Sequence, residues 1–218
     1  MTKGSEDAHR ASGTEAWLCG PLADVSSLLT PAAHALLQAA SDIEQAAVSL
    51  SAEEVWRKPA GAPSVGFHLR HVAGSIDRLL TYASGRQLSE EQFRALSLES
   101  LPGEPAEEAI TLVRTATARI EDALGVLRST PDERLAEPRE VGRARLPSTV
   151  LGLLFHIAEH TQRHTGQIVT TARIVQGLSS TGGVNHERAA QEEYQTGDRS
   201  GDSSERRSTH RQDDSRHC

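Results

Sequence analysis

The amino-acid sequence predicts an all-α protein built around a four-helix bundle. Four segments carry apolar residues at spacings of three and four, which is the pattern of a helix with one buried face. The alternation of apolar and polar residues that marks a half-buried strand is scarce. Helices that each have one apolar face bury those faces against one another, so these segments are expected to form a bundle.

The first two predicted helices have clear starting residues. One begins at Thr30, which serves as N-cap before Pro31 at the first helical position. The other follows Ser64, a second N-cap residue, and runs over residues 65 to 83. The buried stripe of the first helix is expected to consist of Leu36, Ala40, Ile43, Ala47 and Leu50.

Two further helices are expected in the second half of the chain. A connecting stretch, residues 85–105, precedes a helix over about residues 106–128. The buried stripe of this third helix is expected to consist of Val113, Ala116, Ile120, Leu124 and Leu127. A loop that contains three prolines then leads to the longest helix, which runs from about Ser148 to Gln176 and is closed by Gly177.

The two ends of the chain differ in composition from the middle. Residues 1–20 and 179–218 hold few large apolar side chains, too few to offset the entropy cost of ordering, so we predict disordered tails around a folded unit at residues 21–178. No secretory leader and no apolar run of about 20 residues is visible, which predicts a cytoplasmic protein without a membrane partner. The net charge of −7 argues against a nucleic-acid partner.

The ten histidines supply the functional signal. Four lie in the tails, and His34 is expected at the surface because it lies on the side of its helix opposite Leu36. The other five are placed on two helices: His68 and His71 on the second, and His156, His160 and His164 on the fourth. The last three are spaced i, i+4 and i+8, so they share one face, and that face also carries apolar residues.

Buried imidazoles on two facing helices have two interpretations. Each neutral ring brings a polar nitrogen that needs a partner, and one divalent metal ion can be that partner for several rings at once. The alternative is a set of hydrogen-bonded core histidines without a metal. Both interpretations stay open on spacing alone.

The segment from His156 to His160 also matches the H-x-x-E-H pattern of inverted zinc proteases, in which Glu159 would be the general base. Such enzymes need a third ligand well downstream, and only tail glutamates follow here. Glu159 also lies about 100° away from the histidine face. We therefore set the protease interpretation aside.

Two motifs resemble the DinB/YfiT-like family. The first is Ser64-Val-Gly-Phe-His-Leu-Arg-His71, in which a serine precedes a histidine by seven positions at the start of a helix. The second is His160-Thr-Gln-Arg-His164-Thr-Gly-Gln167, which is similar to the H-x-x-x-H-x-G-Q element of that family's last helix. The resemblance extends over roughly residues 30–178.

The resemblance implies a four-helix bundle with up-up-down-down connections, often a homodimer, and one divalent metal, zinc or nickel in relatives. It assigns the metal ligands to His71, His160 and His164. His68 and His156 are nearby alternates that line the pocket, or replace a ligand if the register differs. Gln167 is a candidate for orienting a metal-bound water or a ligand histidine.

Relatives in this family include transferases and isomerases that use the low-molecular-weight thiols bacillithiol or mycothiol. The resemblance therefore implies a metal-dependent S-transferase, with a small thiol cosubstrate and an electrophilic small molecule as partners. The same ion can instead activate water, so a hydrolase is also expected as a candidate. A metal held by three neutral histidines keeps its full charge and favours a bound thiolate. A non-catalytic metal-binding or interaction bundle is the alternative.

The expected pocket face also carries polar side chains beside the histidines. These are Ser75, Arg78, Tyr82, Arg163, Gln167 and Thr171. Arg78 and Arg163 are candidates for binding a carboxylate of the thiol cosubstrate. Both cysteines, Cys19 and Cys218, lie in the predicted tails, so the chemistry is expected to come from the metal, a bound cosubstrate and water.

Overall fold

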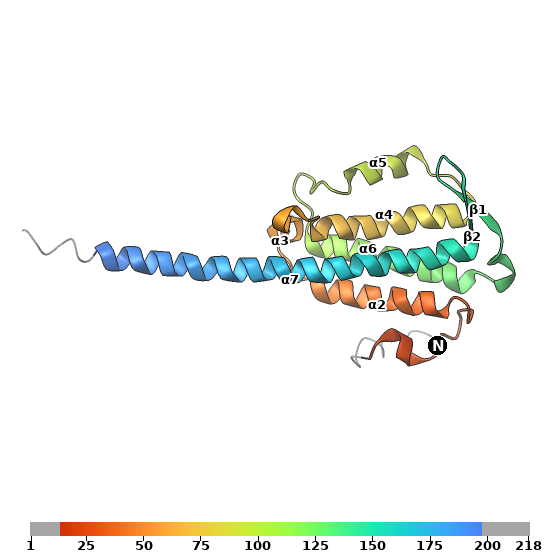
Figure 1. Ribbon diagram of the computed structural model, residues 1–218, viewed down its shortest axis with the longest axis horizontal. Coiled ribbons are helices and arrows are strands. Elements are labelled where there is room, and N and C mark those ends of the chain that lie inside the picture. Colours follow the sequence, from red (N-terminus) through yellow and green to blue (C-terminus); the bar gives the residue numbers. More distant parts are fainter. Residues whose placement is uncertain (1–13, 198–218) are drawn as a thin grey trace, which may run out of the picture. The chain divides into compact units, whose positions relative to one another are not determined.

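The computed structural model describes residues 14–197, with side chains as far as residue 180, and is mostly helical (Figure 1). The α-helices are α2 (Thr30–Ala47), α3 (Ala52–Trp56), α4 (Val65–Ala83), α5 (Glu90–Leu98), α6 (Ala109–Ser129) and α7 (Val150–Gly197). The short 3₁₀ turns are η1 (Ala16–Cys19), η2 (Pro59–Gly61) and η3 (Asp132–Arg134), and the strands are β1 (Pro138–Val141) and β2 (Leu146–Thr149). The chain divides into two units, residues 1–177 and 178–218, and the first is described below.

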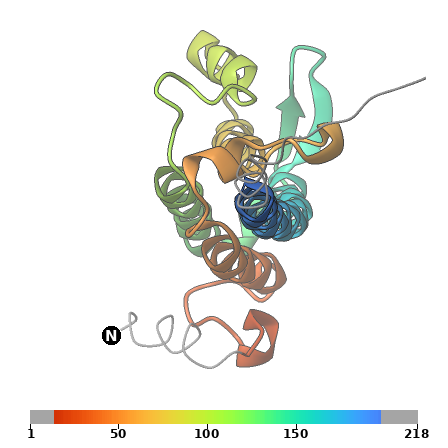
Figure 2. The same cartoon turned by 90° about the vertical axis from the view of Figure 1, so that its left-hand side faces the viewer.

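The long helices of the first unit lie side by side around one apolar core. In the end-on view, α2, α4, α6 and the first part of α7 surround this core (Figure 2). A hydrogen bond of 2.6 Å from the Gln162 side chain to the Ala35 carbonyl joins α7 to α2. The largest fully buried side chains come from all four helices and include Leu36, Ile43, Leu69, Ile76, Ile120, Leu124, Leu154, Ile157 and Ile168. The apolar stripes predicted from the 3.6-residue period are therefore the faces that pack.

Helix α4 has the bounds that its sequence signals predict. The Ser64 hydroxyl accepts a hydrogen bond of 3.1 Å from the Phe67 amide, which caps the first turn. At the other end Gly85 has a φ of 82°, the left-handed conformation that glycine adopts without steric cost. Within the residues that the structure describes, no helix combines the length and the apolarity needed to cross a membrane.

Helix α5 is an addition to the predicted elements, because it lies within the stretch 85–105 that we expected to be a connection. Its start is nevertheless encoded locally: the Ser89 hydroxyl accepts from the Gln92 amide, and the Gln92 side chain accepts from the Ser89 amide. This reciprocal pair is a capping box. The helix carries no fully buried residue, so the apolar periodicity that identified the other helices is weak here.

A two-stranded antiparallel sheet corrects the all-α prediction. Strands β1 and β2 pair in the register Pro138 to Thr149 and Val141 to Leu146, in a segment that we expected to be a loop. Each strand contains a proline, a residue that lacks an amide donor and normally argues against a strand. A two-stranded sheet has only edge strands, on which proline is tolerated, so the hairpin forms in spite of its sequence signals.

Helix α7 extends well beyond its predicted end near Gln176. Gly177, expected to close the helix, lies within it and has no positive φ. The following residues, which we assigned to a disordered tail, are helical as far as Gly197. Their sequence includes a run of Ala, Glu, Gln and Arg at residues 187–193, all good helix formers, and helical backbone hydrogen bonds need no tertiary partner. Residues 1–13 and 198–218 of the predicted tails lie outside the described residues.

His34 is buried, which corrects the prediction that it lies at the surface. Only 7% of its surface is accessible. The segment before α2 covers this side of the helix, since the Ala16 amide donates to the side chain of Gln38, which lies one turn beyond His34. The helical period alone could not reveal this because the covering segment has no periodic signal of its own.

Candidate metal centre

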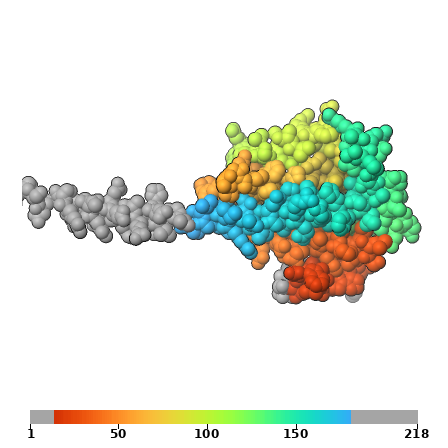
Figure 3. Space-filling model, viewed as in Figure 1, coloured from red at the N-terminus to blue at the C-terminus, as the bar shows by residue number. Residues whose placement is uncertain are grey.

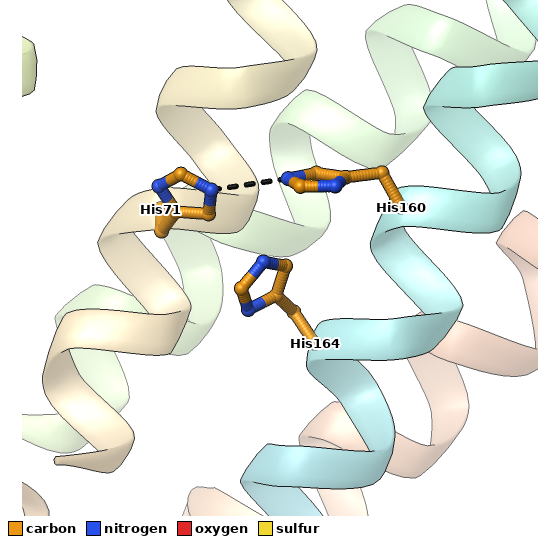
Figure 4. A group of neighbouring side chains, drawn as sticks. All are labelled: His71, His160 and His164. Carbon is orange, nitrogen blue, oxygen red and sulfur yellow. Dashed lines mark hydrogen bonds between the residues drawn. The ribbon is translucent and has the colours of Figure 1, made fainter. Parts of the chain in front are cut away.

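Three histidines from two helices meet in the first unit. His71 comes from α4, and His160 and His164 come from consecutive turns of α7. One ring nitrogen from each lies within 4.8 Å of the others. The Nε2 atoms of His71 and His160 are 3.0 Å apart, and the ring of His164 points toward the same space (Figure 4). The structure therefore brings together the three residues that the family resemblance selects.

The geometry and chemistry of this group fit a divalent ion. Two nitrogens that share a tetrahedral zinc ion at about 2.0–2.1 Å lie about 3.4 Å apart. The separations between the ring nitrogens here, from 3.0 Å to at most 4.8 Å, bracket that value. Three imidazoles leave a fourth position for a thiol, water or substrate, which is the donor set of an open site.

Glu99 holds the far side of the His71 ring. Its carboxylate lies 2.7 Å from His71 Nδ1 and accepts a second hydrogen bond, also 2.7 Å, from Arg78. Burial raises the pKa of Glu99, but the hydrogen bonds from His71 and Arg78 outweigh that effect and bring the pKa below its ordinary value. A carboxylate beside one ring nitrogen is a common partner of a histidine that binds a metal through the other nitrogen.

The other two rings have different surroundings at Nδ1. His164 Nδ1 lies 3.0 Å from Nδ1 of His68, which is buried beneath it. His160 Nδ1 is buried and has no hydrogen-bond partner among the described residues. His68, our alternate for His71, therefore contacts a member of the group through Nδ1, and it is His71 that joins His160 through Nε2.

Burial lowers the pKa of His160 and of His164 to about 4, and the neighbouring His71 strengthens the effect. The pKa of His68 is also lowered to about 4 for the same reasons. These three rings are therefore neutral at pH 7. A neutral imidazole is the form that binds a metal ion, so no proton has to be removed first.

The remaining residues of the predicted pocket lie outside this group. One side of α7 faces solvent (Figure 3). The His156 side chain is 48% exposed, and its Nδ1 atom lies 3.2 Å from Glu159. Glu159 also pairs with Arg163, so that arginine is bound to a residue of its own helix. Gln167, one turn after His164, is exposed.

Arg78, a candidate for binding a carboxylate of a cosubstrate, contacts a carboxylate of the protein itself. Its side chain is buried, and its Nη1 donates a hydrogen bond to the Glu99 carboxylate, so this donor is engaged within the protein. Ser75, also buried, donates its hydroxyl proton to the Val72 carbonyl of its own helix. Tyr82 and Thr171 are likewise buried.

Glu99 is a residue of the site that the sequence patterns do not reveal. It follows α5 directly and is 28 residues from His71, so no local spacing connects the two. One indirect signal was present: Gly74 lies inside an apolar helix, where glycine is unfavourable unless something packs closely against the backbone. A side-chain carbon at that position would lie 2.4 Å from the Glu99 carboxylate.

A comparison with protein families agrees with these observations. The profile of the DinB superfamily matches residues 35–168, more than half of the chain, and this range contains all three histidines and Glu99. A comparison with curated proteins finds no match.

Proposed function

The chain belongs to the DinB superfamily, and we propose that it binds one divalent metal ion, zinc or nickel, through His71, His160 and His164. The observation that carries this proposal is the convergence of three ring nitrogens within 4.8 Å, from helices that are far apart in the sequence. The neutral state of His160 and His164 and the carboxylate at His71 Nδ1 add chemical support. We also propose the up-up-down-down bundle of the family for the long helices, and a homodimer remains a prediction.

We further propose that the site is catalytic and serves transfer of a low-molecular-weight thiol to an electrophilic small molecule. When bound, the ion supplies a position at which a thiol loses its proton near neutral pH. The protein contributes three ring nitrogens and a buried carboxylate that lies against one of the rings. Cys19 is the one cysteine among the described residues and is exposed on η1, which favours a thiol brought in from outside.

Two other functions are outcomes of the same test. Water in the open position would make the protein a hydrolase. A site that binds metal but turns over nothing would make it a metal-binding bundle, with the ion linking α4 to α7. The choice among the three depends on what occupies the fourth position.

The test is a conjugation assay with purified full-length protein loaded with zinc or with nickel. Small thiols, including mycothiol and bacillithiol, are offered together with model electrophiles, and loss of free thiol is followed with time. We expect metal-dependent conjugation that stops with a chelator and in His160→Ala, and persists in His156→Ala, whose exposed ring lies on the same helix. Hydrolysis of an ester panel without thiol consumption would replace the transferase proposal. Absence of both, with metal bound, would favour the non-catalytic bundle.

A further inference from the structure

Glu99 is a buried carboxylate with a site built to receive it. Only 5% of its surface is exposed, and a charge removed from water in this way is costly unless it is paired. Both carboxylate oxygens are engaged at 2.7 Å, one with His71 Nδ1 and the other with Arg78. Both partners belong to α4, so one helix provides the metal ligand and the cation that holds its carboxylate.

Helix α4 has a glycine, Gly74, at the point where the Glu99 side chain packs against it. A Cβ atom at Gly74 would lie 2.4 Å from one Glu99 oxygen and 2.7 Å from Arg78 Nη1. Real Cβ atoms do not approach other atoms so closely, and Gly74 costs its helix stability relative to alanine. Gly125 on α6 provides the contrast, since a Cβ there would meet nothing within 4 Å.

A second arginine on α4 fastens the segment that carries Glu99. Arg70 binds the Glu107 carboxylate with two donors, at 3.1 and 2.7 Å, and also donates to the carbonyls of Leu98, Leu101 and Pro102. Arg70 itself lies against the Trp56 ring, with 4.8 Å between guanidinium carbon and ring centroid. The backbone on both sides of Glu99 is therefore fixed to the helix that bears His71.

We infer that Glu99, held by Arg78 in the gap at Gly74, is the positioning residue of the metal site. By accepting the Nδ1 proton of His71 it selects one tautomer and one ring orientation, and so presents Nε2 to His160. The inference rests on the proposed metal function. It also gives α5 and the segment after it a role, which is to place the Glu99 carboxylate beside His71. Glu99 acts through His71 and needs no contact with the ion.

The first test compares zinc affinity of wild type, Glu99→Gln and Glu121→Gln by competition with a chromophoric chelator. Glutamine keeps the size of the side chain and removes its charge. We expect Glu99→Gln to bind one zinc ion with affinity reduced by about 10–100-fold. Glu121, an exposed glutamate that pairs with Arg128 on α6, is the matched control and should leave affinity unchanged.

The second measurement reads the tautomer directly, which a purely structural role would not move. Long-range ¹H–¹⁵N spectra of the metal-free protein should show His71 protonated at Nδ1 in wild type and in Glu121→Gln, and a mixture of tautomers in Glu99→Gln. Gly74→Ala keeps the charge of Glu99 but displaces its carboxylate. This variant should also show the reduced zinc affinity and the mixture of His71 tautomers. Gly125→Ala is its control, because the added Cβ atom there meets no other atom within 4 Å.

The outcomes separate this inference from the proposed function. Equal zinc affinity and an unchanged His71 tautomer in both Glu99→Gln and Gly74→Ala would overturn the positioning role while leaving the metal site intact. If Glu99→Gln fails to fold, the zinc affinity and the His71 tautomer of Gly74→Ala test the positioning role by themselves. Wild-type protein that binds no zinc overturns the proposed function, and the inference with it.

Discussion

Replacing His160 by alanine is expected to lower zinc affinity several hundredfold, the largest effect of any single change proposed for this protein. Zinc sites with four ligands bind with about 10–16 kcal/mol, so one ligand contributes about 2.5–4 kcal/mol, which centres on a factor of a few hundred in affinity. His160 Nε2 lies 3.0 Å from His71 Nε2, so its removal opens one side of the group. Chelator competition and elemental analysis of purified protein measure the change.

His156→Ala is the matched control for this substitution. It removes an imidazole from the same helix one turn earlier, with a ring centroid 5.3 Å from that of His160. Because His156 is exposed and paired with Glu159, its loss should leave zinc affinity and stoichiometry essentially unchanged. Equal losses in both variants would show that the ion is held by a different set of residues.

The second large effect is on stability. A ligand that binds only the folded state stabilises it by about 4 kcal/mol when present at a thousand times its dissociation constant. The site joins α4 to α7 through residues 89 positions apart, so unfolding separates the ligands. The urea concentration at the unfolding midpoint of the wild type should therefore rise when zinc is added. It should fall back to the metal-free value when a chelator removes the zinc.

The His160→Ala variant serves as the reference for that experiment. Its unfolding midpoint should respond to zinc far less than that of the wild type, because its affinity is reduced. It also loses a buried Nδ1 atom that has no partner among the described residues, so we expect the metal-free variant to remain folded. If zinc left the unfolding midpoint of the wild type unchanged, this would contradict a metal site with ligands from two helices.

The parts of the fold that the sequence predicts well are those with local signals. Helix α4 begins after Ser64 and ends before Gly85 as expected, since an N-cap serine and a C-terminal glycine act within a few residues. Helix α5 and the hairpin of β1 and β2 were missed, although the capping box at Ser89 was available. Each lacks a strong apolar period, on which the prediction depended.

The candidate site was predictable in part for the same reason. The spacing of His160 and His164 places them on one face of a helix whatever the rest of the fold does. His71 could be preferred over His68 only by resemblance, because both lie near the start of the same helix. Glu99 depends on how a distant segment folds back onto α4, and no spacing encodes that contact.

The most direct test of this account is a crystal structure of the full chain grown with zinc, with anomalous diffraction recorded at the zinc edge. We predict one strong peak per chain, at about 2.0–2.1 Å from a ring nitrogen of each of His71, His160 and His164. Glu99 should remain on His71 Nδ1. The proposed metal site would be contradicted if zinc-saturated crystals showed no ion between the three rings, or showed zinc bound by other residues.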